Sequence, residues 1–154
     1  MPGENSGKII KYPDDFLRKR TRKVTDFESA EVSRLILDMQ KIIEEAKGIG
    51  LAAPQVGSDL RICLINVDSE LLILVNPEIK SYSRKKETAE EGCLSFPGKF
   101  LPIERSLKVK VKAQHLSGKK IKIKAEGLLA RVMQHEIDHL DGVLFIDRLK
   151  EHKK

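Results

Sequence analysis

Aromatic residues and long apolar runs are scarce in this sequence. Only 5% of its 154 residues are aromatic, and the basic residues are not interleaved with aromatic ones as in proteins that stack nucleic-acid bases. The longest unbroken apolar run covers residues 71–75, whereas a membrane-spanning helix needs about 20 predominantly apolar residues. The sequence therefore predicts neither a membrane protein nor a reader of a specific nucleic-acid sequence.

Cysteine is also rare, and only Cys63 and Cys93 are present. The first residues contain no apolar stretch of the kind found in a secretion signal, so we expect a cytoplasmic protein. Thiols stay reduced in the cytoplasm, which argues against a disulfide. Both cysteines are then free to bind a metal ion or to pack in the core.

The length and composition fit one soluble globular domain. A chain of 154 residues, of which 40% are hydrophobic and 34% charged, can bury a core of its own. We therefore predict a single domain over residues 1–154. The net charge of +6 allows two interpretations, which are an affinity for polyanions and simply a lysine-rich surface.

The apolar periodicity predicts helices near both ends of the chain. In residues 28–46 apolar side chains recur at the i, i+3, i+4 and i+7 positions of an amphipathic helix. Asp26 is the expected N-cap of this helix, and Gly48 lies near its end. Residues 128–140 are again helical in pattern, and Asp141 and Gly142 end the pattern.

Short strands are predicted between the two helices. Residues 61–67 and 71–77 are apolar and β-like, and residues 107–113 and 120–125 alternate strictly, as the two strands of an antiparallel hairpin do. We therefore predict an α+β fold, in which antiparallel hairpins and sheets pack around the helix 128–140 and an N-terminal amphipathic helix precedes them. The outer face of the hairpin carries six lysines, namely Lys108, Lys110, Lys112, Lys120, Lys122 and Lys124.

The sequence QHEIDH, residues 134–139, places two histidines four residues apart. On a helix His135 and His139 share one face and can present two imidazoles to one ion. Glu136 is offset by about 100° and can stand beside the ion without binding it. This is the H-E-x-x-H arrangement, in which the glutamate is the base for a metal-bound water. The alternative is a charged helix surface on which the spacing is accidental.

A catalytic metal site of this type needs three protein ligands and one open position. No good third ligand follows His139, but Cys93 lies upstream in a turn-rich segment, residues 91–98. A thiolate there could complete the site and would suit zinc or ferrous iron. The alternative for a lone cysteine is a small buried hydrophobe, which is the interpretation that we prefer for Cys63. The other histidines have no partner at ligand spacing and are expected on the surface: His115 and His152.

The glycine-rich residues 48–57 fit the dinucleotide fingerprint G-x-G-x-x-G/A, but not its context. The fingerprint follows a strand and opens a helix, whereas this segment follows a predicted helix, and Pro54 disrupts any helix that starts there. We therefore reject nucleotide binding and expect an extended segment that another backbone can approach closely. Gln55 lies in this segment, and its side-chain amide can donate a hydrogen bond to an oxyanion.

Three segments, GIGLAAPQ, EGCLS and QHEIDH, occur in an order that resembles the peptide deformylase family. The resemblance extends through NPEI, FPG, the hairpin at 109–125 and DGVLFIDRL, and covers about residues 8–149. It implies an enzyme of protein biosynthesis that removes the N-formyl group from the initiator methionine of newly made polypeptides and releases formate. It also implies that the third metal ligand is Cys93.

The resemblance assigns roles to the residues of the site. Cys93, His135 and His139 would hold one divalent metal ion, which is ferrous iron in the cell and can be replaced by zinc, nickel or cobalt. Glu136 would act as general acid and base. The side chain of Gln55 and the backbone N–H of Leu94 would stabilise the oxyanion.

The resemblance also implies where the substrate binds and in which compartment the protein works. An extended N-formylmethionyl nascent peptide would be the partner, with transient contact to the ribosome, no membrane and no specific nucleic-acid sequence. We expect the cytoplasm of a bacterium rather than an organelle. The expected substrate-binding residues are Ile49, Gly50, Ala89, Leu128, Arg131 (through its stem) and Val132.

Two further charged residues lie close to the Cys93 segment. Glu91 opens that segment and Arg105 follows it shortly afterwards. We hypothesise that they pair and support the metal site from outside. The alternative is that Arg105 is a solvated surface charge, which contributes little.

The same sequence features allow two rival functions. A general H-E-x-x-H metalloprotease needs a third ligand downstream and a longer domain, and neither is found in this sequence. A basic, metal-stabilised module that binds RNA or the ribosome is favoured by the net charge and the lysines of the hairpin. However, alternating strands place polar residues in water in any case.

Overall fold

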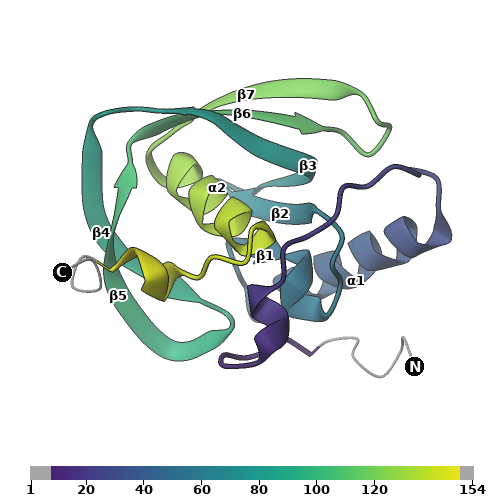
Figure 1. Ribbon diagram of the computed structural model, residues 1–154, viewed down its shortest axis with the longest axis horizontal. Helices are drawn as coiled ribbons and strands as arrows, with labels where there is room; N and C mark the ends of the chain where they lie inside the picture. The colour runs from purple at the N-terminus through teal and green to yellow at the C-terminus, as the bar shows by residue number, and fades with distance from the viewer. Residues whose placement is uncertain (1–7, 150–154) are drawn as a thin grey trace.

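The structure is a computed structural model that describes residues 8–149. Within this range the chain forms two α-helices, seven β-strands and three short 3-10 helices (Figure 1). His152, which was expected on the surface, lies outside the described residues. In chain order the elements are a 3-10 helix Asp15–Arg18, α1 Ala30–Ala46, β1 Gly50–Ala52, a 3-10 helix Ala53–Val56, β2 Ile62–Val67, β3 Glu70–Tyr82, β4 Lys86–Cys93, β5 Phe96–Ser106, β6 Lys108–Gln114, β7 Lys120–Glu126, α2 Gly127–Leu140 and a 3-10 helix Phe145–Arg148.

The strands form two antiparallel sheets. The larger sheet has the order β1-β2-β3-β6-β7, and β4 and β5 form a separate two-stranded ribbon. In Figure 1 the ribbon lies on the left and α2 runs between it and the larger sheet. The predicted α+β class with antiparallel strands is confirmed. β1 is the edge strand of the larger sheet, so its outer edge has no strand partner within residues 8–149.

Alternation along β2 explains how the larger sheet is covered on both faces. Cys63 and Ile65 pack in the cluster that contains the apolar side chains of α2. Ile62 and Leu64 pack in the cluster that contains those of α1. A strand buried on both faces is apolar without interruption, which is why β2 shows no polar alternation in the sequence.

The β6–β7 hairpin is confirmed, and it is covered on one face only. Val109, Val111 and Ala113 of β6 are buried in the cluster formed with α2. The lysines of both strands are exposed and alternate with these buried residues. The period of two therefore sends one set of side chains to the core and the other to solvent. We call the exposed set the lysine face: Lys108, Lys110, Lys112, Lys120, Lys122 and Lys124.

The prediction that Asp26 caps the first helix is wrong. Ser29 is the N-cap, and its hydroxyl oxygen accepts a hydrogen bond of 3.2 Å from the backbone N–H of Val32. Asp26 accepts instead from the backbone N–H of Glu28 in the turn before the helix. Both residue types favour caps and turns, so the sequence alone did not distinguish the two starting points.

The glycine-rich segment is extended for three residues only, in β1. It then enters the 3-10 helix Ala53–Val56, in which Pro54 occupies one of the first two positions. The expectation that Pro54 excludes a helix here is wrong for this short turn, because the missing N–H of proline is not needed in a first turn. The segment follows α1 and opens no α-helix, as a dinucleotide site would require.

Candidate metal centre

The two histidines of the H-E-x-x-H sequence lie on a buried part of α2. His135, Glu136 and His139 are 7%, 4% and 1% exposed, respectively. The same helix packs its apolar side, including Met133 and Ile137, against the larger sheet. These residues therefore do not lie on a solvated helix surface, where an accidental spacing would be expected.

The end of β4 brings Cys93 to these histidines. The register of β4 and β5 shifts between Gly92 and Cys93, and irregularities of this kind re-aim side chains next to active sites. The Sγ atom of Cys93 lies 3.3 Å from Nε2 of His139. The potential ligand atoms of Cys93, His135 and His139 all lie within 4.8 Å of one another. Such an arrangement can bind one ion at about 2.0–2.3 Å from each donor.

The surroundings of the three donors fit a divalent cation. Two buried polar atoms, Glu136 Oε1 and His139 Nδ1, have no hydrogen-bond partner among the described residues. An unpaired buried carboxylate oxygen is costly unless something at the site satisfies it. A Cys-His-His donor set beside a free carboxylate oxygen matches a catalytic cation with an open position for water. The second cysteine has no such setting, because Cys63 is fully buried in the core and burial raises the pKa of its thiol strongly.

Glu91 holds one of the two histidines in position. His135 Nδ1 lies 2.9 Å from Glu91 Oε1, so that the N–H donates to the carboxylate and Nε2 is left for a metal ion. Arg105 donates to both oxygens of the same carboxylate, at 2.8 Å from Nε and 3.0 Å from Nη2. Burial acts to raise the pKa of Glu91, but the hydrogen bonds from His135 and Arg105 hold it at about 2.

Arg105 is buried, with 5% of its surface exposed, and is not a solvated surface charge. Its third nitrogen, Nη1, donates to Asp138 at 2.7 Å, and Arg148 donates to both oxygens of Asp138. Neither Asp138 nor Arg148 was predicted from the sequence. Asp138 could have been found from its position three residues after His135, because residues at this spacing lie next to each other on one helix face.

Replacing Arg105 by alanine is expected to destabilise the protein and weaken metal binding together. The change leaves Glu91 and Asp138 buried with fewer partners, and breaking a buried ion pair costs about 3–5 kcal/mol. Thermal unfolding and metal titration measure the two effects. Arg22→Ala is the matched control, because Arg22 makes exposed ion pairs with Asp59 and Glu31 that contribute little. Equal effects of the two variants would contradict the supporting role of Arg105.

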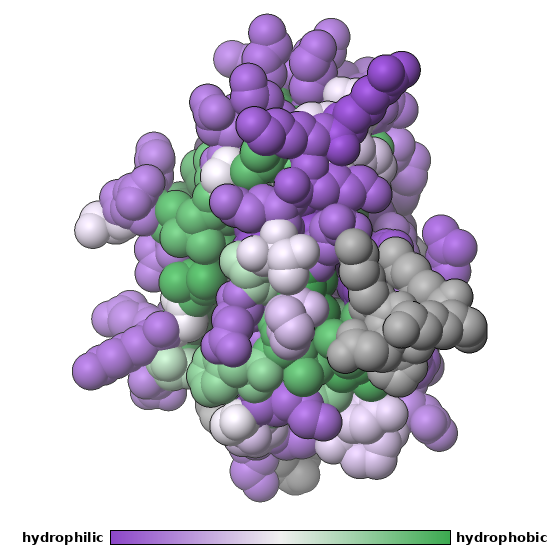
Figure 2. Space-filling model, turned by 90° about the vertical axis from the view of Figure 1, so that its left-hand side faces the viewer, coloured by the Kyte–Doolittle hydropathy of each residue, from purple (hydrophilic) through white to green (hydrophobic). Residues whose placement is uncertain are grey.

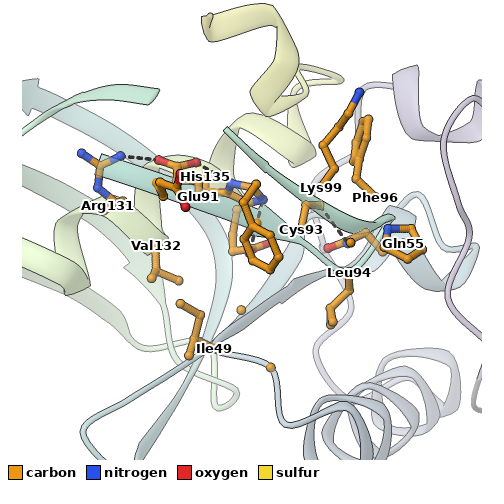
Figure 3. Close-up of a pocket in the computed structure, with 18 of the residues that line it drawn as sticks. Ile49, Gln55, Glu91, Cys93, Leu94, Phe96, Lys99, Arg131, Val132 and His135 are labelled. Carbon is orange, nitrogen blue, oxygen red and sulfur yellow. Dashed lines mark hydrogen bonds and ion pairs between the residues drawn. The ribbon is translucent and has the colours of Figure 1, made fainter. Parts of the chain in front are cut away.

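Gln55 is fixed in one orientation beside the metal centre. Its Oε1 accepts from the backbone N–H of Ala52 at 2.9 Å, and its Nε2 donates to Ser95 Oγ at 3.0 Å. The same Nε2 lies 3.7 Å from Cys93 Sγ. The amide nitrogen of Gln55 therefore faces Ser95 and Cys93. Figure 3 shows Gln55, Cys93 and Leu94 on one side of the cavity.

A cavity of about 490 Å³ lies beside the three donors. Five of the six expected substrate-binding residues line this cavity. The sixth, Ala89, does not line it and lies half-buried in β4, opposite Ile103. Figure 2 views the side on which β4 and β5 lie, and shows hydrophobic residues gathered below a hydrophilic area. Several residues of the wall were not expected from the sequence: Gly92, Phe96, Pro97, Lys99 and Phe100.

Arg131 connects this cavity to the metal centre. It lines the cavity, as expected, but its guanidinium also donates to Glu91 Oε2 at 2.6 Å (Figure 3). The same group donates to the backbone oxygens of Ile103 and Glu87. One side chain of α2 thus contacts the cavity, the carboxylate that orients His135, and both strands of the ribbon.

The carboxylate of Glu136 lies directly against β1. A Cβ atom added at Gly50 would clash with Glu136 Oε2. Burial raises the pKa of Glu136 to about 7, so this carboxyl group can hold or release a proton near neutral pH. Glycine at position 50 is thus what allows the strand and the carboxylate to lie side by side.

Gly50→Ala is expected to lower turnover about 100-fold, because a shift of about 1 Å in a reacting group can cost that much. The atoms nearest to the added methyl group belong to Glu136 and not to Cys93, His135 or His139, so metal content should remain full. Formate release and metal content measured on the same preparation test this. Turnover equal to that of the original protein would show that the position of Glu136 is not limiting.

The grouping of Cys93, His135 and His139 next to a buried carboxylate and a cavity is the arrangement expected of a metal-dependent hydrolase. The family model described as polypeptide deformylase matches residues 6–154, and the chain belongs to this family. Members of the family remove the N-formyl group from newly made polypeptides and release formate, and this chain is accordingly an enzyme of protein biosynthesis. The resemblance found in the sequence is confirmed.

Individual relatives agree with this assignment along most of the chain. A peptide deformylase of Natranaerobius thermophilus is 46% identical over 145 residues, which cover 94% of this chain and 92% of the relative. One of Thermotoga neapolitana is 47% identical over 143 residues, covering 93% and 87%. The crystal structure of peptide deformylase from Thermotoga maritima superposes with a TM-score of 0.89 at 44% identity, covering 93% of this chain and 97% of that one.

No helix within residues 8–149 is both long enough and apolar enough to cross a membrane.

Proposed function

We propose that Cys93, His135 and His139 hold the catalytic metal ion and that Glu136 moves the proton in deformylation. The observation that carries this proposal is the convergence of the three donors within 4.8 Å beside the buried carboxylate. We further propose that residues 1–154 form one catalytic domain that works in the bacterial cytoplasm. Its partners are N-formylmethionyl nascent peptides, with transient contact to the ribosome.

The metal ion is proposed to be ferrous iron in the cell, with zinc, nickel or cobalt as substitutes. One thiolate and two imidazoles suit these borderline cations better than magnesium or calcium, which prefer oxygen. When bound, such an ion supplies Lewis acidity and lowers the pKa of a water molecule at the site.

Glu136 is proposed to serve as base and then as acid. Its Oε1 is free to accept a proton from the attacking water, and its raised pKa keeps the proton exchangeable near neutral pH. The protonated carboxyl then delivers the proton to the departing amine. The Nε2 of Gln55 and the backbone N–H of Leu94 donate hydrogen bonds to the oxygen on which negative charge develops.

The substrate is proposed to bind as an additional strand at the open edge of β1. Peptides commonly add to an exposed sheet edge through main-chain hydrogen bonds, while pockets beside the edge select their side chains. Here the cavity beside Gly50 would take the methionine side chain against Leu128, Val132 and the stem of Arg131. Ile49 would lie along the same peptide.

Formate release from formyl-Met-Ala-Ser, measured with and without a chelator, tests the proposed function. We expect release that stops on chelation and returns when metal is added. A binding module would release no formate, and a general metalloprotease would cleave peptides that carry no formyl group. Metal analysis of protein purified without oxygen identifies the ion, and absence of iron would contradict its proposed identity.

A further inference from the structure

The lysine face is a dense array of positive charge that the fold itself does not neutralise. In the register of β6 and β7, Lys110 lies opposite Lys124 and Lys112 lies opposite Lys122. Like charges placed directly opposite on an antiparallel pair are destabilising. Within residues 8–149, none of the six lysines forms an ion pair.

The acidic residues next to this array leave its centre positive. Glu126 lies opposite Lys108 at one end of the hairpin. On the other side Glu78 of β3 lies opposite Lys112, but its carboxylate is within ion-pair distance of Lys23 and Lys80. The two lysine pairs therefore face solvent together, and a ligand with several negative charges would relieve their repulsion.

The array is on a part of the sheet that neither α1 nor α2 covers. The apolar side chains of β6 pack in the cluster that contains α2, so the lysines point the opposite way. The other helix, α1, packs on that opposite face but against the β1, β2 and β3 end. Figure 1 shows the hairpin along the upper edge of the molecule, and Leu116 in its turn packs against the cluster that contains α1. The paired lysines lie further along the two strands. The lysine face is accordingly independent of the catalytic cavity.

We propose that the lysine face binds the phosphate backbone of RNA. Lysines on alternate residues recur about every 7 Å along a strand, and the two strands lie about 5 Å apart. Such a flat grid can contact several phosphates at once, and phosphate contacts by lysine need no base sequence. The face carries no aromatic side chain for stacking bases, so the backbone rather than the bases is the expected target.

Two other anionic partners fit the surface less well. A membrane-binding surface combines basic residues with apolar side chains that enter the lipid, and the alternate exposed positions of β6 and β7 offer only lysine, glutamine and glutamate. RNA is preferred over DNA because the substrates are newly made polypeptides, which are produced on an RNA-rich particle. This last step rests on the proposed function, whereas the charge array does not.

The experiment compares two variants that lose the same charge. Lys110, Lys112, Lys122 and Lys124 are replaced together by glutamine in the first variant. The control replaces four exposed lysines outside the lysine face by glutamine, namely Lys19, Lys41, Lys85 and Lys86. Binding of each protein to a short fluorescent RNA duplex is measured by anisotropy over a series of salt concentrations. Formate release from a short formyl peptide is measured on the same preparations.

The original protein is expected to bind the duplex with a strong dependence on salt. The lysine-face variant should bind at least about tenfold more weakly than the control, and the slope of log K against log salt should fall by about 4, since each phosphate contact contributes about 1. Formate release should be unchanged in both variants. Failure of the proposed function would abolish formate release in every protein and leave the RNA comparison intact.

Several results would overturn the proposal. They are the absence of RNA binding at low salt, an equal loss in the control variant, and binding to phosphatidylglycerol vesicles that is as tight as binding to RNA. Should the fourfold variant fail to fold, Lys112→Gln with Lys124→Gln removes one member of each pair and should lower the slope by about 2. Lys122→Glu adds a second measurement, because pairing it with Lys112 should raise the thermal midpoint while weakening RNA binding.

Discussion

Glu136→Gln is expected to leave the metal ion in place and to remove almost all turnover. Glutamine has nearly the same shape and fits the same buried position, so the three ligands should bind metal in full. Its amide cannot accept the proton of the attacking water, and losing general acid–base help costs at least about 10²–10⁴ in rate. The loss should fall mainly on kcat, because the carboxylate acts in the transition state more than in substrate binding.

The same substitution at Glu90 is the matched control. Glu90 also lines the cavity but is exposed, so Glu90→Gln should keep near-full turnover. If Glu136 were a metal ligand, Glu136→Gln would lose metal along with activity. If it took no part in proton transfer, the variant would release formate at the original rate. One variant, assayed for metal and for formate, thus distinguishes three roles.

Removing any one of the three donors is expected to remove the metal ion. Cys93→Ala, His135→Ala and His139→Ala each leave only two protein ligands, and catalytic sites of this kind are built on three. Losing a group that only supports a ligand typically lowers metal affinity roughly 10- to 100-fold. Losing a ligand itself should lower the affinity by more than this. Metal content by elemental analysis and formate release should decrease together.

Cys63→Ala separates the two cysteines. Cys63 is fully buried in the core between the sheet and α2, and it is not among the three grouped donors. Its replacement should keep the metal ion and most of the turnover, with at most a small loss of stability. Full metal occupancy in Cys93→Ala would contradict the assignment of the third ligand.

The sequence determined those features that depend on local periodicity. The spacing of His135 and His139 is sufficient to place both imidazoles on one face, because a helix repeats every 3.6 residues or so. Strict alternation likewise predicted the β6–β7 hairpin and its lysine face, because successive side chains of a strand point to opposite sides. Three short segments in a fixed order were enough to indicate the family.

The tertiary structure alone decided how distant segments meet at the site. The pairing of Glu91 with Arg105 was hypothesised from the sequence, but its bidentate geometry and its burial, the link of Arg105 to Asp138, and the position of Ala89 outside the cavity came from the structure. None of these contacts follows from local periodicity, because each joins residues from different elements. The same type of side chain can be exposed to solvent or buried, and the packing of the whole chain determines which of the two occurs.

The properties of Glu136 illustrate the division most clearly. The sequence places Glu136 directly after His135, and helix geometry then turns its side chain about 100° away from the face shared by the two histidines. That its pKa rises to about 7 follows from burial beneath β1 and the ribbon, and Gly50 is what permits that approach. Burial is a property of the assembled chain, since removing a carboxylate from water requires neighbours that come from elsewhere in the sequence.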